Sequence, residues 1–323
     1  MIKYQDLLTS DNFRDALTAK KLCLFLGAGV ARNINMPDWN GLAINIANFC
    51  FHKKIFNHST LHTLLMITEP LKIISYCIQK VEEKSKSEEL KKFFEEIFCK
   101  NPLTYYDQHN TLYKYFSEIY KTGKVLLVQT NYDSVIEESI RKSKMTIQPY
   151  IPYNDANIEL SNNLLVYLHG KYTDNYNDIV LTKQKYNEVY VLQNEKNQEY
   201  EKQKYFFKNL LENYSIVILG YSLQDNEIIQ LIANRKNVES YKTINIIIDN
   251  CKAKEISNAI DEKYWRESCN DNINIYTYDI EKKGYAAFKK VISNLKKEIC
   301  KSVQQDIITL TDPSQIEDLD DYI

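Results

Sequence analysis

The sequence predicts an α/β fold with a doubly wound, mostly parallel sheet of about six strands and a helical insertion. Short runs of consecutive aliphatic residues recur along the chain, and most precede a segment with helical periodicity. Such runs are typical of parallel strands that are covered by helices on both faces of a sheet. The alternation of strands and helices therefore favours a Rossmann-like arrangement.

The apolar runs divide the chain into strands and helices. The predicted strands are Leu22–Leu26, Val125–Gln129, Leu164–Leu168, Ile216–Leu219, Ile244–Ile248 and Ile273–Tyr278. Helical patterns follow most of them, for example at Ser134–Lys142, Asn226–Arg235 and Tyr285–Lys297.

The spacing of the strands is uneven, and the longest gap predicts a helical insertion over about residues 40–122. Its expected helices are Trp39–Phe51, Thr60–Val81, Ser87–Phe98 and Leu103–Tyr120. A second insertion, Thr182–Asn213, is predicted to form one or two amphipathic helices. We expect one domain over residues 1–300 and an acidic tail over 301–323, which is either flexible or docked on a neighbouring subunit.

Charge and composition exclude several classes of function. The formal net charge of −2 gives no overall basic field, so direct binding of nucleic acid is not expected. No apolar run approaches the roughly 20 residues that cross a bilayer, and the N-terminal residues lack the apolar core of a secretion signal. The seven cysteines are scattered and form no C-x-x-C pair, so neither a disulfide framework nor a metal site is expected. We expect a cytoplasmic protein.

The first polar strand end is the segment Gly27-Ala28-Gly29, which follows a buried strand. A G-A-G turn brings backbone N–H groups close to a phosphate. Arg32 occupies the third glycine position of the dinucleotide pattern, so the full motif is not met. A tight turn that binds no ligand is the alternative.

Two further strand ends carry side chains suited to catalysis. Thr130, Asn131 and Asp133 follow the second strand, and His169 follows the third beside Gly170. A histidine at this edge is placed to act as a general base near neutral pH. The alternatives are that Thr130 and Asp133 form a capping box for the next helix and that His169 is an ordinary core residue.

The last two strand ends offer groups for a nucleotide. Ser222 and Asp225 follow Gly220 and fit either a helix cap or a phosphate contact. Asp249 and Asn250 follow the next strand, where a carboxylate either holds a ribose hydroxyl or caps the strand. Five polar strand ends on one sheet predict an extended nucleotide cleft.

Taken in order, these motifs resemble those of sirtuin-like domains in bacterial anti-phage defence proteins. The segments are G-A-G-V-A-R, M-P-D-W, T-N-Y-D, L-H-G, G-Y-S-L-Q-D and I-I-D-N, over about residues 20–295. Members of this family consume NAD⁺, so the resemblance implies NAD⁺ as substrate. This chain differs from the family pattern at Ala31, where many relatives have Ser, and at Asn35, where many have Gly. The four-cysteine zinc module of the deacetylating sirtuins is missing, which disfavours protein deacylation.

The resemblance also implies roles for individual residues. It assigns catalysis to Asn131, His169 and Asp133. The residues expected to bind NAD⁺ are Gly27, Ala28, Gly29, Thr130, Gly220, Ser222, Asp225, Asp249 and Asn250.

The function predicted from the sequence is hydrolysis of NAD⁺ to nicotinamide and ADP-ribose. The resemblance implies an abortive-infection effector that is controlled by assembly or by a partner. It also implies a homo-oligomer or a separately encoded partner, such as a HerA-like ATPase or an Argonaute. The alternatives are a non-catalytic module that binds NAD⁺ or ADP-ribose and an NAD-dependent deacylase.

Overall fold

The computed structural model describes residues 2–34, 36–104, 111–155, 159–173, 175–191, 197–221, 226–235, 242–281, 284 and 286–311. These residues form one sheet of eight strands, and every pair of neighbouring strands is parallel. The strands are β1 (Ile2–Lys3), β2 (Leu22–Leu26), β3 (Val125–Gln129), β4 (Gln148–Tyr150), β5 (Leu164–Tyr167), β6 (Ser215–Leu219), β7 (Ile244–Asn250) and β8 (Asn274–Asp279).

The order of the strands across the sheet is β1-β8-β7-β6-β2-β3-β5-β4. Without the short edge strands β1 and β4, the inner strands run β5-β3-β2-β6-β7-β8, so the chain winds outward from the centre in both directions. This is the Rossmann order, and the prediction of a doubly wound parallel sheet is confirmed. The winding reverses between β2 and β6, and ligands of such sheets bind at this reversal.

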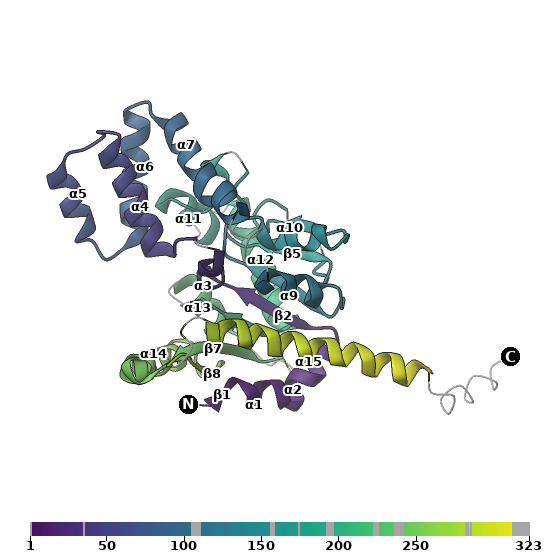
Figure 1. The fold of residues 1–323 in the computed structure, drawn as a ribbon. Coiled ribbons are helices and arrows are strands. Elements are labelled where there is room, and N and C mark those ends of the chain that lie inside the picture. The colour runs from purple at the N-terminus through teal and green to yellow at the C-terminus, as the bar shows by residue number, and fades with distance from the viewer. Residues whose placement is uncertain are drawn as a thin grey trace.

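Helices cover both faces of the sheet (Figure 1). They are α1 (Tyr4–Thr9), α2 (Asp11–Thr18), α3 (Ala28–Ala31), α4 (Trp39–His52), α5 (His58–Leu65), α6 (Pro70–Glu83), α7 (Ser87–Glu95), α9 (Thr111–Tyr120), α10 (Val135–Lys142), α11 (Lys183–Tyr190), α12 (Gln198–Asn213), α13 (Asn226–Ala233), α14 (Glu255–Ser268) and α15 (Ala286–Thr311). Short turns are the 3₁₀ helices η1 (Arg32–Ile34), η3 (Tyr176–Asp178) and η4 (Lys252–Lys254), and the π-helical η2 (Glu96–Lys100).

Side chains of the central strand point alternately into two apolar cores. Leu24 lies in the core formed with α1, α2, α9, α10 and α15, and Phe25 lies in the core formed with α12, α13 and α14. All five residues of β2 are buried, and the same is true of β3 and β6. Burial on both faces explains why these strands are continuous apolar runs in the sequence.

The predicted insertion divides into two parts. Helices α4–α7 form a group beside the sheet, well away from the long α15 (Figure 1). The expected helix Thr60–Val81 is wrong as a single helix, because Pro70 starts α6 as a separate helix after α5. The last helix, α9, packs against β3, α10 and α15, so it belongs to the layer that covers the sheet. The second insertion forms α11 and α12, as predicted.

The sheet edges and the chain end differ from the sequence prediction. The short edge strands β1 and β4 were not predicted. The expected domain end at residue 300 lies inside α15, which continues to Thr311, and the acidic residues 312–323 lie outside the described ranges. Across those ranges, no helix has the length and apolar character needed to cross a bilayer.

Candidate functional site

Two glycine turns meet where the strand order reverses. The Gly27 amide donates to the Leu219 carbonyl at 2.9 Å, and the Gly29 amide donates to the Gly220 carbonyl at 2.8 Å. A Cβ atom added to Gly29 would lie 2.8 Å from the Gly220 Cα, and one added to Gly27 would lie 2.6 Å from the Tyr221 Cα. The turns are therefore in backbone-to-backbone contact, which only glycine permits.

This contact changes the interpretation of the G-A-G turn. We expected its amides to face a phosphate, but those of Gly27 and Gly29 donate to the neighbouring turn. Ala28 lies between them and begins the short helix α3. The glycines thus bring β2 and β6 together at the reversal and shape this edge of the sheet through packing.

Asn131 joins the end of β3 to the first glycine turn. Its Nδ2 donates to the Gly27 carbonyl at 3.3 Å, and its side chain is buried. The preceding residue, Thr130, donates its amide to the Leu26 carbonyl at 3.0 Å and so still pairs with β2. The alternative of a capping box formed by Thr130 and Asp133 is wrong, because helix α10 begins only at Val135.

Asp133 is a buried carboxylate behind Asn131. Its Oδ1 accepts the Val135 amide at 2.9 Å, so it caps the start of α10. Burial raises the pKa of Asp133 to about 6, against the opposing effect of hydrogen bonds from the amides of Val135 and Asp133 itself. Within the described part of the chain, no cation forms a salt bridge with this carboxylate. Its negative charge can therefore act on a cation that enters the site.

His169 follows β5 at the same edge, half-buried between two tyrosine rings. The ring centroid of Tyr190 is 5.7 Å from that of the imidazole, at an interplanar angle of 87°. The Tyr132 ring, between Asn131 and Asp133 in sequence, is 6.5 Å away on centroids. The T-N-Y-D and L-H-G segments are thus neighbours in space, linked through Tyr132.

Asp249 and Asn250 lie on the other side of the reversal. Asp249 and Asn250 are the last residues of β7 and pair with β8, so the strand continues two residues beyond its predicted end. The Asp249 carboxylate forms an ion pair with Lys254 at 2.5 Å. Ser222 and Asp225 lie outside the described residues.

Helix α10, which follows Asp133, carries a buried charged network that no sequence motif indicates. The buried Glu137 accepts hydrogen bonds from the Tyr167 hydroxyl at 3.0 Å and from Lys171 at 2.7 Å, and it pairs with Arg141 at 2.5 Å. Burial, with the charges of Glu137 and Asp133, raises the pKa of Tyr167 well above its ordinary value. The one signal in the sequence is Glu137 itself, a charged residue on the face of the predicted helix that carries the apolar residues.

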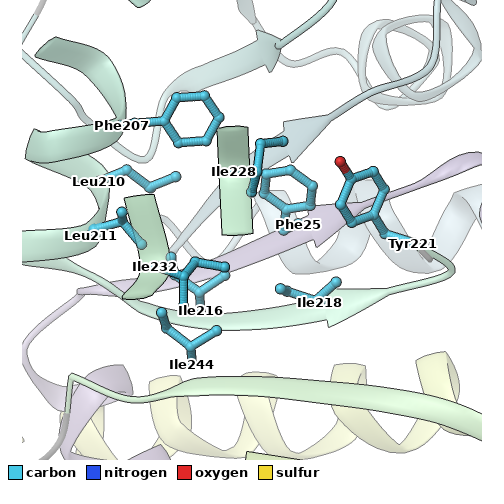
Figure 2. A pocket seen from close by; sticks show the side chains of 10 residues that line it. All are labelled: Phe25, Phe207, Leu210, Leu211, Ile216, Ile218, Tyr221, Ile228, Ile232 and Ile244. Atoms are coloured by element: carbon cyan, nitrogen blue, oxygen red, sulfur yellow. The ribbon is translucent and has the colours of Figure 1, made fainter. Parts of the chain in front are cut away.

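An apolar hollow lies beside the second glycine turn, under α12 and α13 (Figure 2). Its lining residues are Phe25, Phe207, Leu210, Leu211, Ile216, Ile218, Tyr221, Ile228, Ile232 and Ile244. The hollow belongs to the second core, and except for the Tyr221 hydroxyl its lining side chains carry no polar group. It therefore holds none of the groups suited to catalysis.

No metal centre is evident in the described ranges, where no three His, Cys, Asp or Glu side chains gather as ligands. The seven cysteines are free thiols, and four of them, Cys23, Cys50, Cys77 and Cys269, are buried.

The fold and the site together define a class of protein. A parallel sheet with Rossmann order, whose polar strand ends meet at the reversal, is typical of nucleotide-binding α/β domains. Residues 125–273 match the family model of the SIR2-like domain. The match supports a sirtuin-like domain and an NAD-related function; it includes Asn131, Asp133 and His169 but begins after the G-A-G turn. The curated proteins contain no match to this chain.

Proposed function

We propose that the protein hydrolyses NAD⁺ to nicotinamide and ADP-ribose at the strand ends of β2, β3, β5 and β6. The observation that carries the proposal is the hydrogen bond from Asn131 to the Gly27 carbonyl. It joins the reversal of strand order, where dinucleotides bind in such folds, to the segment of Asp133, whose Tyr132 contacts the His169 ring. The SIR2-like match over residues 125–273 supports NAD⁺ as the nucleotide.

Hydrolysis of the bond between ribose and nicotinamide requires few catalytic side chains. Breaking the N-glycosidic bond builds positive charge on the ribose, and nicotinamide leaves as a neutral molecule, so no strong acid is required. In this mechanism Asn131 positions the ribose and a water molecule. His169 acts as general base on that water or on a ribose hydroxyl. Asp133, ionised above pH 6, either orients Asn131 or stabilises the positive charge in a site of low dielectric constant.

The test is a chromatographic assay of nicotinamide release from NAD⁺. Asn131→Ala and His169→Ala should each lower the rate about 100-fold or more, since precise positioning and a general base each contribute that much. His62→Ala is the matched control, because His62 is exposed on α5. Near-normal rates in both site variants would overturn the assignment. Binding without release would favour a nucleotide-binding module, and acetyl-ADP-ribose formed with an acetyl-peptide would favour a deacylase.

We further propose that this activity serves anti-phage defence by depleting NAD⁺ in infected cells. Such an enzyme harms its host when it is always active, so its basal rate should be low and released by assembly or by a partner. Infection should deplete NAD⁺ in cells that carry the wild-type protein and not in cells that carry His169→Ala. Equal NAD⁺ levels in the two strains after infection would count against the role in defence.

A further inference from the structure

Two tyrosines flank His169, and both are held by the backbone around it. The Tyr132 hydroxyl donates to the Val180 carbonyl at 2.7 Å, and the Val180 amide donates to the His169 carbonyl at 2.8 Å. The Tyr190 hydroxyl donates to the Leu168 carbonyl at 3.4 Å. Each ring is therefore fixed relative to the peptide groups that carry the imidazole.

Gln203 holds Tyr190 from the next helix. This residue of α12 is buried, and its Nε2 donates to the Tyr190 hydroxyl at 3.0 Å and to the Leu168 carbonyl at 3.3 Å. Its buried Oε1 accepts no hydrogen bond from the described residues. A buried side-chain amide whose oxygen accepts no hydrogen bond lowers stability compared with an apolar residue. Such a residue in a folded protein usually has a further role. The position of Gln203 against Tyr190 provides one.

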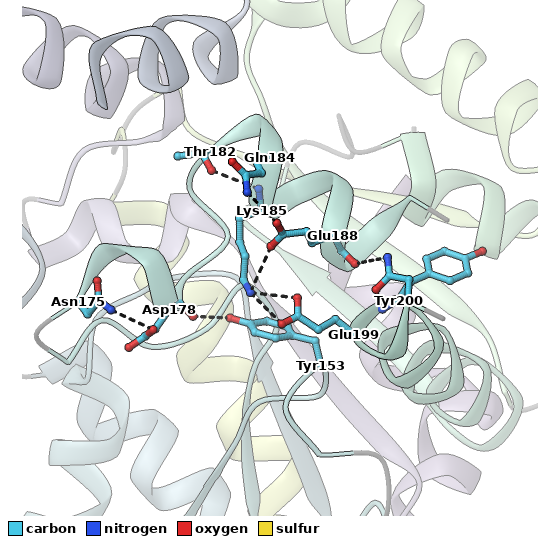
Figure 3. A network of polar contacts seen from close by, with 10 residues as sticks. Tyr153, Asn175, Asp178, Thr182, Gln184, Lys185, Glu188, Glu199 and Tyr200 are labelled. Atoms are coloured by element: carbon cyan, nitrogen blue, oxygen red, sulfur yellow. Dashed lines mark hydrogen bonds and ion pairs between the residues drawn. The ribbon is translucent and has the colours of Figure 1, made fainter. Parts of the chain in front are cut away.

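An ion-pair network holds α11, the helix of Tyr190, from the outside (Figure 3). Lys185 of α11 pairs with Glu199 of α12 at 3.0 Å, and its ammonium group lies 5.5 Å from the centroid of the Tyr153 ring. The Tyr153 hydroxyl donates to the Asp178 carbonyl at 2.9 Å. A Cβ atom on Gly170, the residue after His169, would collide with this hydroxyl. A continuous chain of contacts through Tyr153 therefore links Lys185 to Gly170, the residue after His169.

We propose that Tyr190, held by Gln203, is a positioning residue that fixes the orientation of the His169 imidazole for proton transfer. The proposal rests on the function proposed above. The Tyr190 and His169 rings meet edge to face, with centroids 5.7 Å apart and planes at 87°, which is an arrangement that aromatic pairs favour. Without the bonds to Leu168 and Gln203, the phenyl ring turns more freely and the imidazole follows it. Small misplacements of a catalytic group lower rates by about 10- to 100-fold.

The experiment compares Tyr190→Phe and Gln203→Leu with Tyr205→Phe. The control removes a hydroxyl from an exposed tyrosine of α12, two residues from Gln203. We expect the first two variants to lower kcat about 10-fold or more, with KM changed less than about 2-fold, and to shift the pH profile of nicotinamide release. Thermal denaturation confirms that all three variants are folded.

A second measurement separates this proposal from the proposed function. In protein labelled at histidine, the NMR titration of His169, assigned with His169→Ala, reports the imidazole without substrate. We expect Tyr190→Phe and Gln203→Leu to change its chemical shifts and titration, and Tyr205→Phe to leave them unchanged. Unchanged His169 signals and kcat in both variants would overturn the positioning role. Changed signals, together with full activity of His169→Ala, would show that Tyr190 orients the imidazole but would reject proton transfer by His169 and with it the proposed mechanism.

Discussion

The two halves of the site are built in different ways. On the β2–β6 side, glycine turns are pressed together backbone to backbone, and the added Cβ of Gly220 would lie 2.8 Å from the Val30 amide nitrogen. On the β3–β5 side, the side chains of Asn131, Asp133 and His169 occupy the same edge of the sheet. One half is defined by the absence of side chains and the other by their chemistry.

This difference teaches which residues report on function. The glycines at 27, 29 and 220 are required by the packing of the turns, whether or not a ligand binds. Asp133 accepts the Val135 amide, a structural role that a neutral asparagine side chain can also fill, whereas burying its ionisable carboxylate opposes folding at neutral pH. A buried ionisable group that lowers stability at the polar edge of the sheet is the stronger indication of catalysis.

The largest effect on stability is expected at the glycine half, for Gly220→Ala. Gly123 is the matched control: its φ of +63° is close to the +64° of Gly220, but its Cβ would meet no atom within 4 Å. Both variants place alanine in the left-handed region, which costs about 1 kcal/mol. Gly220→Ala should cost about 1–3 kcal/mol more, because it forces the turns apart. Urea unfolding measures both, and equal losses would mean that the turns separate freely.

The second effect separates stability from activity at Asp133. Because its folded pKa of about 6 exceeds the ordinary value, ionisation opposes folding as the pH rises from about 4 to above 6. Asp133→Asn removes this loss of stability, which is worth up to about 3 kcal/mol at pH 7. At pH 7.5 the variant should be more stable than wild type. At pH 4.5 this gain in stability should be smaller. The variant should also release nicotinamide more slowly than wild type.

Urea unfolding at the two pH values checks this prediction, with the exposed Asp261→Asn as control. If the gain in unfolding free energy of Asp133→Asn over wild type is no larger at pH 7.5 than at pH 4.5, the wild-type protein does not bury an ionised carboxylate at this position.

The smallest effect is expected at Asp249. Asp249→Asn and Lys254→Met both remove the ion pair between these partly exposed side chains, so each should change stability by less than about 1 kcal/mol. Only Asp249→Asn removes the carboxylate that we expect to hold a ribose hydroxyl. Its KM for NAD⁺ should therefore rise about 10-fold, since a hydrogen bond to a charged group is worth about 1.5–3 kcal/mol. Equal KM values in the two variants would place Asp249 outside the site.

The sequence predicted the interior of the sheet well and its margins poorly. Strands β2 and β3 have the predicted bounds, because strands buried on both faces must be continuously apolar. The edge strands β1 and β4 escaped prediction because they are short and largely exposed, and β4 contains Pro149. Without a long apolar run there is no signal in the sequence.

The site shows the same limit. Asn131 and His169 could be found because strand ends of a parallel sheet share one edge. Tyr190 and Gln203 could not, because their positions depend on how α11 and α12 pack on the segment after β5. The hydrogen bonds that hold them join residues up to 35 positions apart, which no local pattern encodes.

The pairing of β1 with β8 constrains the order in which the molecule can be completed. Ile2 accepts a hydrogen bond from the Thr277 hydroxyl, and Tyr4 accepts one from Asn294 of α15 at 2.8 Å. During synthesis on a ribosome, the strands from β2 to β7 emerge before these partners exist. Helices α1 and α2 are made before β8 and α15, so the parts of their apolar faces that pack on these elements stay uncovered until α15 has left the ribosome.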